Sequence, residues 1–84
     1  MLSEDLVEEI DLLLRFDLSS TQLGLKIHSS AESNVIAAAE RLFEKGLTSQ
    51  VDGGYLTELG RESAEYLQRA TTILRSKPAV TADS

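Results

Sequence analysis

Acidic side chains stand one helical turn apart at three places in this chain, namely Glu4 with Glu8, Asp5 with Glu9, and Glu58 with Glu62. Such pairs can bind a metal ion or share a proton in acid–base catalysis. Each pair lies in a segment with amphipathic helical periodicity, where acids at this spacing are typical of the solvated face. We therefore interpret them as surface charges and expect no metal site from them.

His28 is the single histidine of the chain, and there is no cysteine. Histidine can transfer protons near neutral pH or bind zinc, but a zinc site needs several such ligands held together. No Ser-His-Asp set and no glycine-rich phosphate loop is recognisable in the sequence. We expect no enzymatic activity, no cofactor and no small-molecule ligand, with His28 in a solvated turn.

The composition indicates one small acidic domain. The 84 residues are 42% hydrophobic and carry 8 basic against 14 acidic side chains, a net charge of −6. Much of the excess acid lies in the first 18 residues, so this segment opposes binding to a polyanion. The chain has no apolar run long enough for a bilayer and no basic leader. With no cysteine, these features predict a cytoplasmic protein without a membrane segment.

Hydrophobic periodicity predicts four helices, at about residues 3–16, 20–27, 31–45 and 58–75. The expected caps are Ser3 for the first helix, Ser19 with Gln22 for the second, and Thr57 for the last. The third helix is expected to be capped by Ser29 paired with Glu32, or by Ser30 itself. Gly46 fits the end of the third helix. In the second, Gly24 would allow a close approach to another helix.

Two short strands are predicted between the last two helices. Residues 47–51 alternate in polarity, residues 55–57 return, and Asp52-Gly53-Gly54 between them is a hairpin signal. Residues 77–84 follow the last helix and are expected to form a flexible tail, so the domain spans 1–76. The fold class is α+β, with a three-helix core, a two-stranded hairpin and a long C-terminal helix.

Three motifs occur in the order found in winged helix-turn-helix domains. Arg41-Leu42-Phe43-Glu44-Lys45-Gly46-Leu47 resembles the end of a recognition helix, Val51-Asp52-Gly53-Gly54-Tyr55 a very short wing, and Tyr55-Leu56-Thr57-Glu58-Leu59-Gly60-Arg61 a strand-to-helix junction. Together they resemble bacterial regulators of the MarR and PadR type over residues 19–62. The whole chain also resembles a small family of uncharacterised bacterial proteins labelled as DNA-binding proteins or transcriptional regulators.

The resemblance implies a surface for double-stranded DNA. In winged helices the third helix enters the major groove and the wing reaches a neighbouring groove or phosphate. The positions that this implies are Lys26, His28, Ser29, Ser30, Ser33, Asn34, Ala37 and Gln50, with Asp52, Gly53, Gly54 and Tyr55 in the wing. Glu32 and Asp52 oppose this assignment, because each would repel phosphate.

The first helix carries apolar residues around more than half of its circumference, which predicts a second buried contact. We expect a homodimer through the terminal helices, with an interface of Leu2, Leu12, Phe16, Leu67, Ile73 and Leu74. Arginines of the last helix would then face acids of the partner's first helix. The leading hypothesis is a DNA-binding, transcription-regulating protein. The alternative is a protein-interaction module that has lost DNA binding and offers its acidic first helix to a partner.

Overall fold

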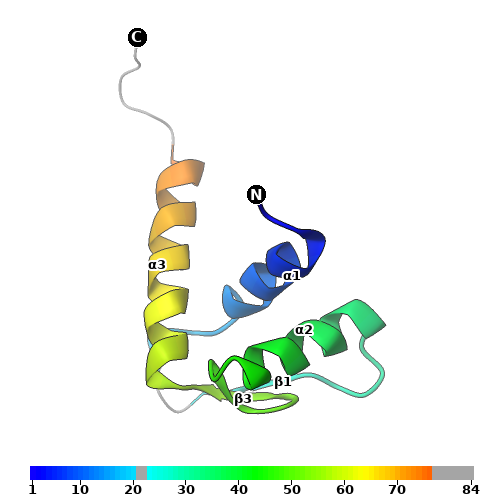
Figure 1. The fold of residues 1–84 in the computed structure, drawn as a ribbon. Coiled ribbons are helices and arrows are strands. Elements are labelled where there is room, and N and C mark those ends of the chain that lie inside the picture. The colour runs from blue at the N-terminus through cyan, green and yellow to red at the C-terminus, as the bar shows by residue number, and fades with distance from the viewer. Residues whose placement is uncertain (21–22, 77–84) are drawn as a thin grey trace, which may run out of the picture.

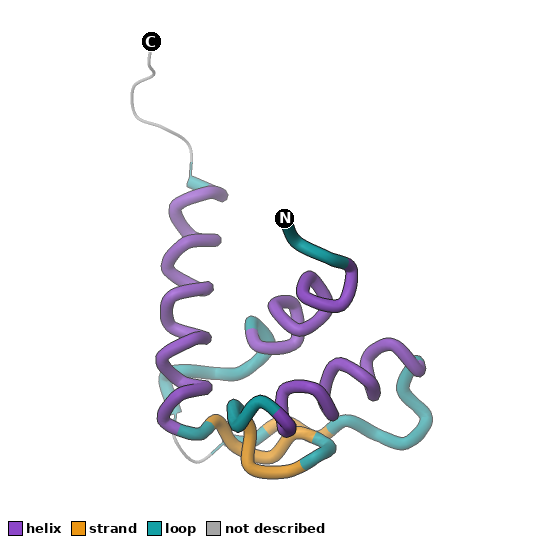
Figure 2. Tube along the Cα trace, in the orientation of Figure 1, coloured by secondary structure: helices purple, strands orange, loops and turns teal. Residues whose placement is uncertain are grey.

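A computed structural model describes residues 1–20 and 23–76, which form three helices and a three-stranded antiparallel sheet (Figures 1 and 2). In chain order the elements are α1 (Glu4–Leu13), β1 (Leu25–Lys26), α2 (Ser33–Glu44), β2 (Thr48–Gln50), β3 (Gly53–Leu56) and α3 (Glu58–Arg75). The predicted α+β class is confirmed. The predicted tail at 77–84 lies outside the described residues.

The ends of the helices follow from short-range hydrogen bonds. Ser3 Oγ accepts from the Leu6 N–H at 3.2 Å and begins α1, and Thr57 Oγ1 accepts from the Gly60 N–H at 3.0 Å and begins α3. Gly46, at φ +80°, ends α2 because this backbone conformation is costly for residues with a Cβ atom. The predictions of these three boundaries are confirmed.

The predicted helix at 20–27 is wrong. Leu25–Lys26 forms strand β1, which pairs with β3, and the Ile27 N–H donates to the Asp52 carbonyl at 2.8 Å. Leu25 and Ile27 pack against the core while Lys26 is exposed, which is the alternation of a strand. In so short an apolar segment, the sequence pattern alone does not distinguish this alternation from helical spacing. The free edge of the hairpin supplies hydrogen-bond partners for β1, and tertiary pairing decides between the two periods.

Gly24 has a different role from the one predicted. A Cβ atom at this position would lie 2.7 Å from the carbonyl oxygen of Gly54, so the glycine permits a close backbone approach to β3 rather than to a helix. The predicted cap of the missing helix also fails. Ser19 instead donates from both its N–H and its Oγ to Asp17 Oδ1, closing a turn, while Gln22 lies outside the described residues.

The start of α2 also differs from the prediction. The helix begins at Ser33 with Glu32 in the N-cap position, and the Glu32 side chain makes no capping hydrogen bond. Ser29 and Ser30 lie in the preceding turn, which the Ala31 N–H closes by donating to the His28 carbonyl at 2.9 Å. The serines are therefore exposed turn residues and do not cap the helix.

The sheet has the strand order β1-β3-β2, so the strand that closes the hairpin lies in the middle. Thr48 pairs with Leu56 and Gln50 with Gly53, with an irregularity between them. The hairpin is tighter than predicted, because Gly53 and Gly54 belong to β3 and adopt φ angles of +116° and +77°. Val51 and Asp52 therefore form its turn.

The core lies where α1 meets α2 and the sheet. Its buried members are Leu12, Leu13, Ile27, Ala38, Ala39 and Leu42. Figure 1 shows α3 standing beside α1 and extending past it, with the sheet at its lower end. Leu12 and Phe16 are buried within the single chain, so their prediction as dimer-interface residues is wrong. Both side chains are used by the chain's own interior.

The first turn of α3 is seated directly on the end of the α2–β2 connection. A Cβ atom at Gly60 would lie 1.9 Å from the carbonyl oxygen of Leu47. The same connection is held by Thr57, whose N–H donates to the Leu47 carbonyl at 3.1 Å and whose Oγ1 donates to the Gly46 carbonyl at 2.6 Å. The glycine of the strand-to-helix junction is therefore a packing requirement.

Candidate functional site: the α2–hairpin groove

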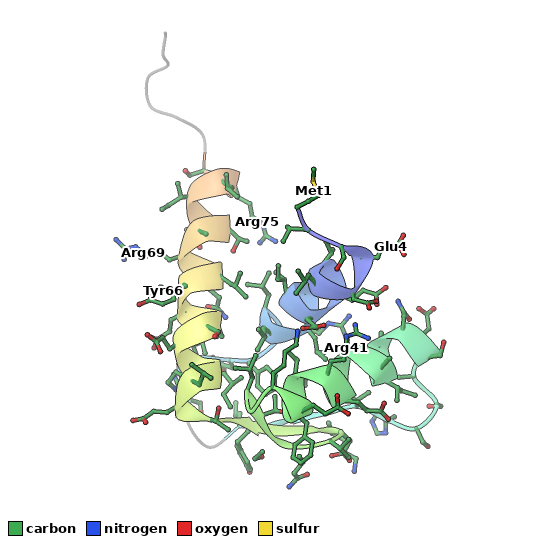
Figure 3. All side chains as sticks on the ribbon, viewed as in Figure 1. Met1, Glu4, Arg41, Tyr66, Arg69 and Arg75 are labelled. Carbon is green, nitrogen blue, oxygen red and sulfur yellow. The ribbon has the colours of Figure 1, made fainter. Side chains whose placement is uncertain are left out.

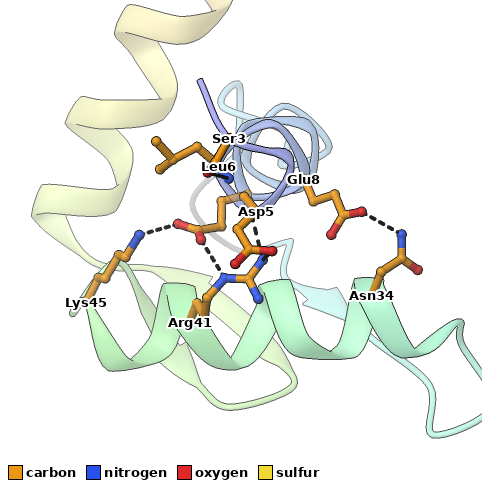
Figure 4. Close-up of polar contacts among 8 residues, drawn as sticks. Ser3, Asp5, Leu6, Glu8, Asn34, Arg41 and Lys45 are labelled. Carbon is orange, nitrogen blue, oxygen red and sulfur yellow. Dashed lines mark hydrogen bonds and ion pairs between the residues drawn. The ribbon is translucent and has the colours of Figure 1, made fainter. Parts of the chain in front are cut away.

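The two side chains best suited to contact DNA are both held by carboxylates of the same chain. The Asn34 side-chain amide donates to Glu8 Oε2 at 2.9 Å (Figure 4), and Lys26 Nζ lies 3.0 Å from Asp52 Oδ2. An amide engaged in this way has one donor fewer for an adenine edge. The neutralised lysine likewise offers less to a phosphate group.

A second polar cluster joins α1 to α2. Glu9 is only 4% exposed, and its carboxylate accepts from Arg41 Nε at 2.6 Å and from Lys45 Nζ. Arg41 also donates to the backbone carbonyl of Asp5 at 3.3 Å (Figure 4). The predicted assignment of Glu9 to the solvated face is wrong, because α2 covers it and supplies two cations.

The protonation of this cluster follows from its geometry. Burial alone would raise the pKa of Glu9, but the hydrogen bonds from Lys45 and Arg41 outweigh burial and hold the pKa below its usual value. The Glu9 carboxylate raises the pKa of Arg41 in return. The cluster holds α1 against α2, because Glu9 pairs with both cations and Arg41 also lies 3.8 Å from the carboxylate of Asp5.

These contacts bear on the expected pairing between acids of the first helix and arginines of a partner's last helix. Glu8 and Glu9 are already engaged by α2 of their own chain. Arg61 is engaged as well, because its Nη1 donates to the Leu18 carbonyl at 3.0 Å. For these three residues the predicted intermolecular pairing is replaced by contacts within the chain.

The remaining predicted DNA-contacting residues are dispersed along the α2–sheet side. His28, Ser29, Ser30, Ser33 and Gln50 are exposed, and Ala37 is half-buried. Tyr55 is also exposed, and its backbone N–H donates to Ser49 Oγ at 2.9 Å. The structure gathers Lys26, His28, Ser29 and Asp52 around one depression, whereas Ser30, Ser33, Asn34 and Gln50 do not line it.

This depression, called the α2–hairpin groove below, has a volume of about 420 Å³. Its lining comprises Lys26, Ile27, His28, Ser29, Ile36, Ala39, Glu40, Val51 and Asp52. The floor is apolar, formed by Ile27 directly after β1, by Ile36 and Ala39 from α2, and by Val51 from the hairpin turn. Lys26, Glu40 and Asp52 supply charges around it.

Five of these lining residues were not predicted as site residues, namely Ile27, Ile36, Ala39, Glu40 and Val51. Of these, only Val51 was named in a motif, at the start of the predicted wing. The signal lies in β1, because pairing of Leu25–Lys26 with β3 brings the next residues against α2. Only a correct strand assignment for β1 would have placed the groove.

The charges around the groove are unevenly matched. The hydrogen bond from Lys26 lowers the pKa of Asp52, so this pair is ionised and mutually neutralised. Glu40 is exposed and adds a negative charge on the α2 side. Within residues 1–20 and 23–76, no group of three or more His, Cys, Asp or Glu side chains could hold a metal ion. The groove is thus an apolar depression with a weakly acidic margin.

Comparison with known proteins places the chain in a family by its sequence. A family model described as "Family of unknown function (DUF5669)" matches residues 1–75. The chain belongs to this DUF5669 family. No curated protein matches the chain, and neither does any solved structure. In the described part of this DUF5669 protein, no helix is both long and apolar enough to cross a membrane.

Proposed function

We propose that this DUF5669 protein is a non-enzymatic protein-binding module whose α2–hairpin groove holds a short apolar segment of a partner protein. The observation that carries the proposal is the apolar floor of a depression of about 420 Å³. A depression lined by Ile27, Ile36, Ala39 and Val51 gains free energy when an apolar side chain displaces its water. This volume suits a few side chains of a peptide.

The charge around the groove favours a partner segment that also carries a basic residue. Glu40 contributes an exposed carboxylate, and the whole chain has a net charge of −6. Complementary charge accelerates encounter and fixes the orientation of the segment more than it adds affinity. The proposed ligand is therefore a short segment with apolar anchors and a lysine or arginine.

A second candidate function is the binding of double-stranded DNA through a winged helix. It is favoured by the strand order β1-β3-β2 and by α2, which immediately precedes the hairpin and starts at the exposed Ser33. The described residues lack the helix predicted before α2. This candidate ranks second because carboxylates of the same chain already engage the side chains of Lys26 and Asn34.

A peptide titration followed by ¹⁵N NMR tests the proposal. The probe is the acetylated, amidated peptide Leu-Lys-Val-Leu-Arg, and the comparison peptide replaces its two basic residues by glutamate. We expect chemical-shift changes for Ile27, Ile36, Ala39 and Val51 with the basic peptide, and smaller changes with the acidic one. The absence of changes in the groove at millimolar peptide would contradict the proposal.

A matched pair of substitutions locates the binding. Val51 and Val7 are 50% and 49% exposed, but only Val51 lines the groove. Val51→Glu places a charge on the apolar floor and should weaken peptide binding by about tenfold or more. Val7→Glu should leave it unchanged. Equal loss in both variants would show that the peptide binds elsewhere.

A titration of a fluorescent 20-base-pair duplex at low salt separates the two candidate functions. The protein-binding proposal expects no change in anisotropy at micromolar protein. Binding that weakens as salt rises, and that is lost when Lys26 and Asn34 are both changed to alanine, would instead support the DNA candidate.

A further inference from the structure

A stripe of five residues runs along one side of α3, and all but the half-buried Ser63 are exposed. Its members are Leu59, Ser63, Tyr66, Ala70 and Ile73, called the α3 seam below. The side chains of Leu59, Tyr66 and Ile73 are 53%, 65% and 63% exposed. Tyr66 and Arg69 point away from the rest of the molecule, whereas Arg75 lies on the side of α1 (Figure 3). The seam therefore faces solvent.

The spacing of the seam is that of a coiled-coil contact. Its residues are separated by four, three, four and three positions, an average of 3.5. An adjacent face of α3 is already committed, since Gly60 and Ala64 are buried against the body of the domain. The α3 helix thus has two contact faces, and the chain itself covers one of them.

We propose that the α3 seam binds the same seam of a second copy of this chain, with the two helices antiparallel. Leu59, Tyr66 and Ile73 occupy one heptad position, and Ser63 and Ala70 occupy the other. Large and small residues therefore alternate along the seam. A helix that binds the seam must place small residues opposite its large ones. The orientation of the second helix decides whether this happens.

An antiparallel second copy supplies this complement. Antiparallel coiled coils place the two heptad positions opposite one another, so Tyr66 faces Ser63 of the partner subunit and Leu59 faces Ala70 of the partner subunit. A parallel copy would place Tyr66 on its own counterpart and leave a gap where two serines meet. Matched volumes pack better than this, because interiors tolerate neither voids nor overlap.

Charge favours the same orientation. Glu62 and Arg69 flank the seam on one edge, one heptad apart. In the antiparallel register above, Glu62 faces Arg69 of the partner subunit, and the symmetric contact repeats the pair. A parallel copy would place Glu62 beside Leu67 of the partner subunit, where it has no cation. The charge pattern thus selects an antiparallel self-association.

The expected interaction is modest. The residues that overlap run from Leu59 to Ala70, and at 1.5 Å per residue this is roughly 17 Å of helix. A contact of this length buries less surface than a standard protein–protein interface. We expect dimerisation at tens to hundreds of micromolar protein.

Charge reversal tests the proposal. Glu62→Arg and Arg69→Glu each place like charges at both pairs of a homodimer, whereas the mixed dimer restores both attractions. By sedimentation velocity, each variant alone should dissociate at least about fivefold more readily than the wild type. An equimolar mixture should dimerise as the wild type does. A wild type that stays monomeric at millimolar concentration, or a mixture that stays monomeric, would overturn it.

Cysteine cross-linking tests the register directly, because the chain has no cysteine of its own. A mixture of Ser63→Cys and Tyr66→Cys should oxidise mainly to the mixed disulfide. Disulfides formed mainly between identical variants would contradict the antiparallel orientation. Far-UV circular dichroism of each variant shows that it is folded.

The seam and the groove have no lining residue in common, so their tests fail separately. Tyr66→Glu should weaken dimerisation and leave binding of the basic peptide to the groove unchanged. Val51→Glu should do the reverse. If Tyr66→Glu leaves the sedimentation of the protein unchanged, the seam is not the contact, whatever the groove binds.

Discussion

Glu9 of α1 accepts a 2.6 Å hydrogen bond from Nε of Arg41 across the α1–α2 contact, although 32 residues separate them in the chain. Lys45, one turn after Arg41, binds the other carboxylate oxygen. Removing one partner of a buried ion pair leaves a charge without compensation, so breaking this contact costs free energy of folding. This contact therefore fixes how α1 sits on α2 and gives a direct test of the described packing.

Glu9→Gln should destabilise the protein. The amide keeps the shape of the side chain but removes the charge, leaving Arg41 and Lys45 without their carboxylate. We expect a loss on the order of 2 kcal/mol in the free energy of unfolding by urea. Glu8→Gln, which affects one exposed contact to Asn34, should change it by less than about 0.5 kcal/mol. Equal effects would contradict the burial of Glu9.

The stabilisation from Glu9 should depend on pH in a defined direction. Because the folded state lowers the pKa of Glu9 from 4.5, its contribution is fully present above pH 4.5. It is lost as the pH falls through the lowered pKa, when the carboxylate protonates. The difference in unfolding free energy between wild type and Glu9→Gln should thus shrink from pH 6 to about pH 3. A difference that grows on acidification would refute this.

Gly24→Ala distinguishes the strand from the helix predicted at 20–27. In an exposed helix the change would stabilise the protein by up to about 1 kcal/mol. In the structure the added methyl group meets the carbonyl oxygen of Gly54 at 2.7 Å, so we expect a loss of about 1–2 kcal/mol. Thermal unfolding followed by circular dichroism measures the sign. A raised midpoint would favour the helix.

Gly60→Ala should be more damaging than Gly24→Ala. The Cβ atom would lie 1.9 Å from the carbonyl oxygen of Leu47, which is backbone and cannot swing aside. We expect a loss of about 3 kcal/mol or failure to fold. Ala70→Gly at an exposed position of the same helix controls for helix propensity and should cost about 1 kcal/mol. A Gly60→Ala protein as stable as wild type would place α3 differently.

The predictable parts of the fold are those that local chemistry decides. Ser3 and Thr57 cap helices through hydrogen bonds that span three residues, and Gly46 ends α2 through its own backbone angle. These features need no knowledge of distant segments. The segment at 20–27 failed because Leu25 and Ile27 suit either a helix or a strand, and the choice depends on β3, almost 30 residues away.

The candidate sites were likewise hard to predict where they depend on residues far apart in the chain. Glu9 was predicted to be solvated because it stands one helical turn from Asp5 on an amphipathic helix. Only the packing of α2 brings Arg41 and Lys45 to it. Lys26 and Asn34 were identified as DNA-contacting residues by type and position. Their carboxylate partners, Asp52 and Glu8, are 26 residues away in each case and carry no local mark.

Thr57 joins the hairpin, which contributes to the α2–hairpin groove, to α3, which carries the α3 seam. It holds the segment that leads into β2 through the Gly46 and Leu47 carbonyls, and its Oγ1 also caps α3. Because one residue anchors both elements, loss of the Thr57 hydroxyl would disturb the hairpin and the start of α3 together, whereas a substitution within the groove or the seam would affect that surface alone.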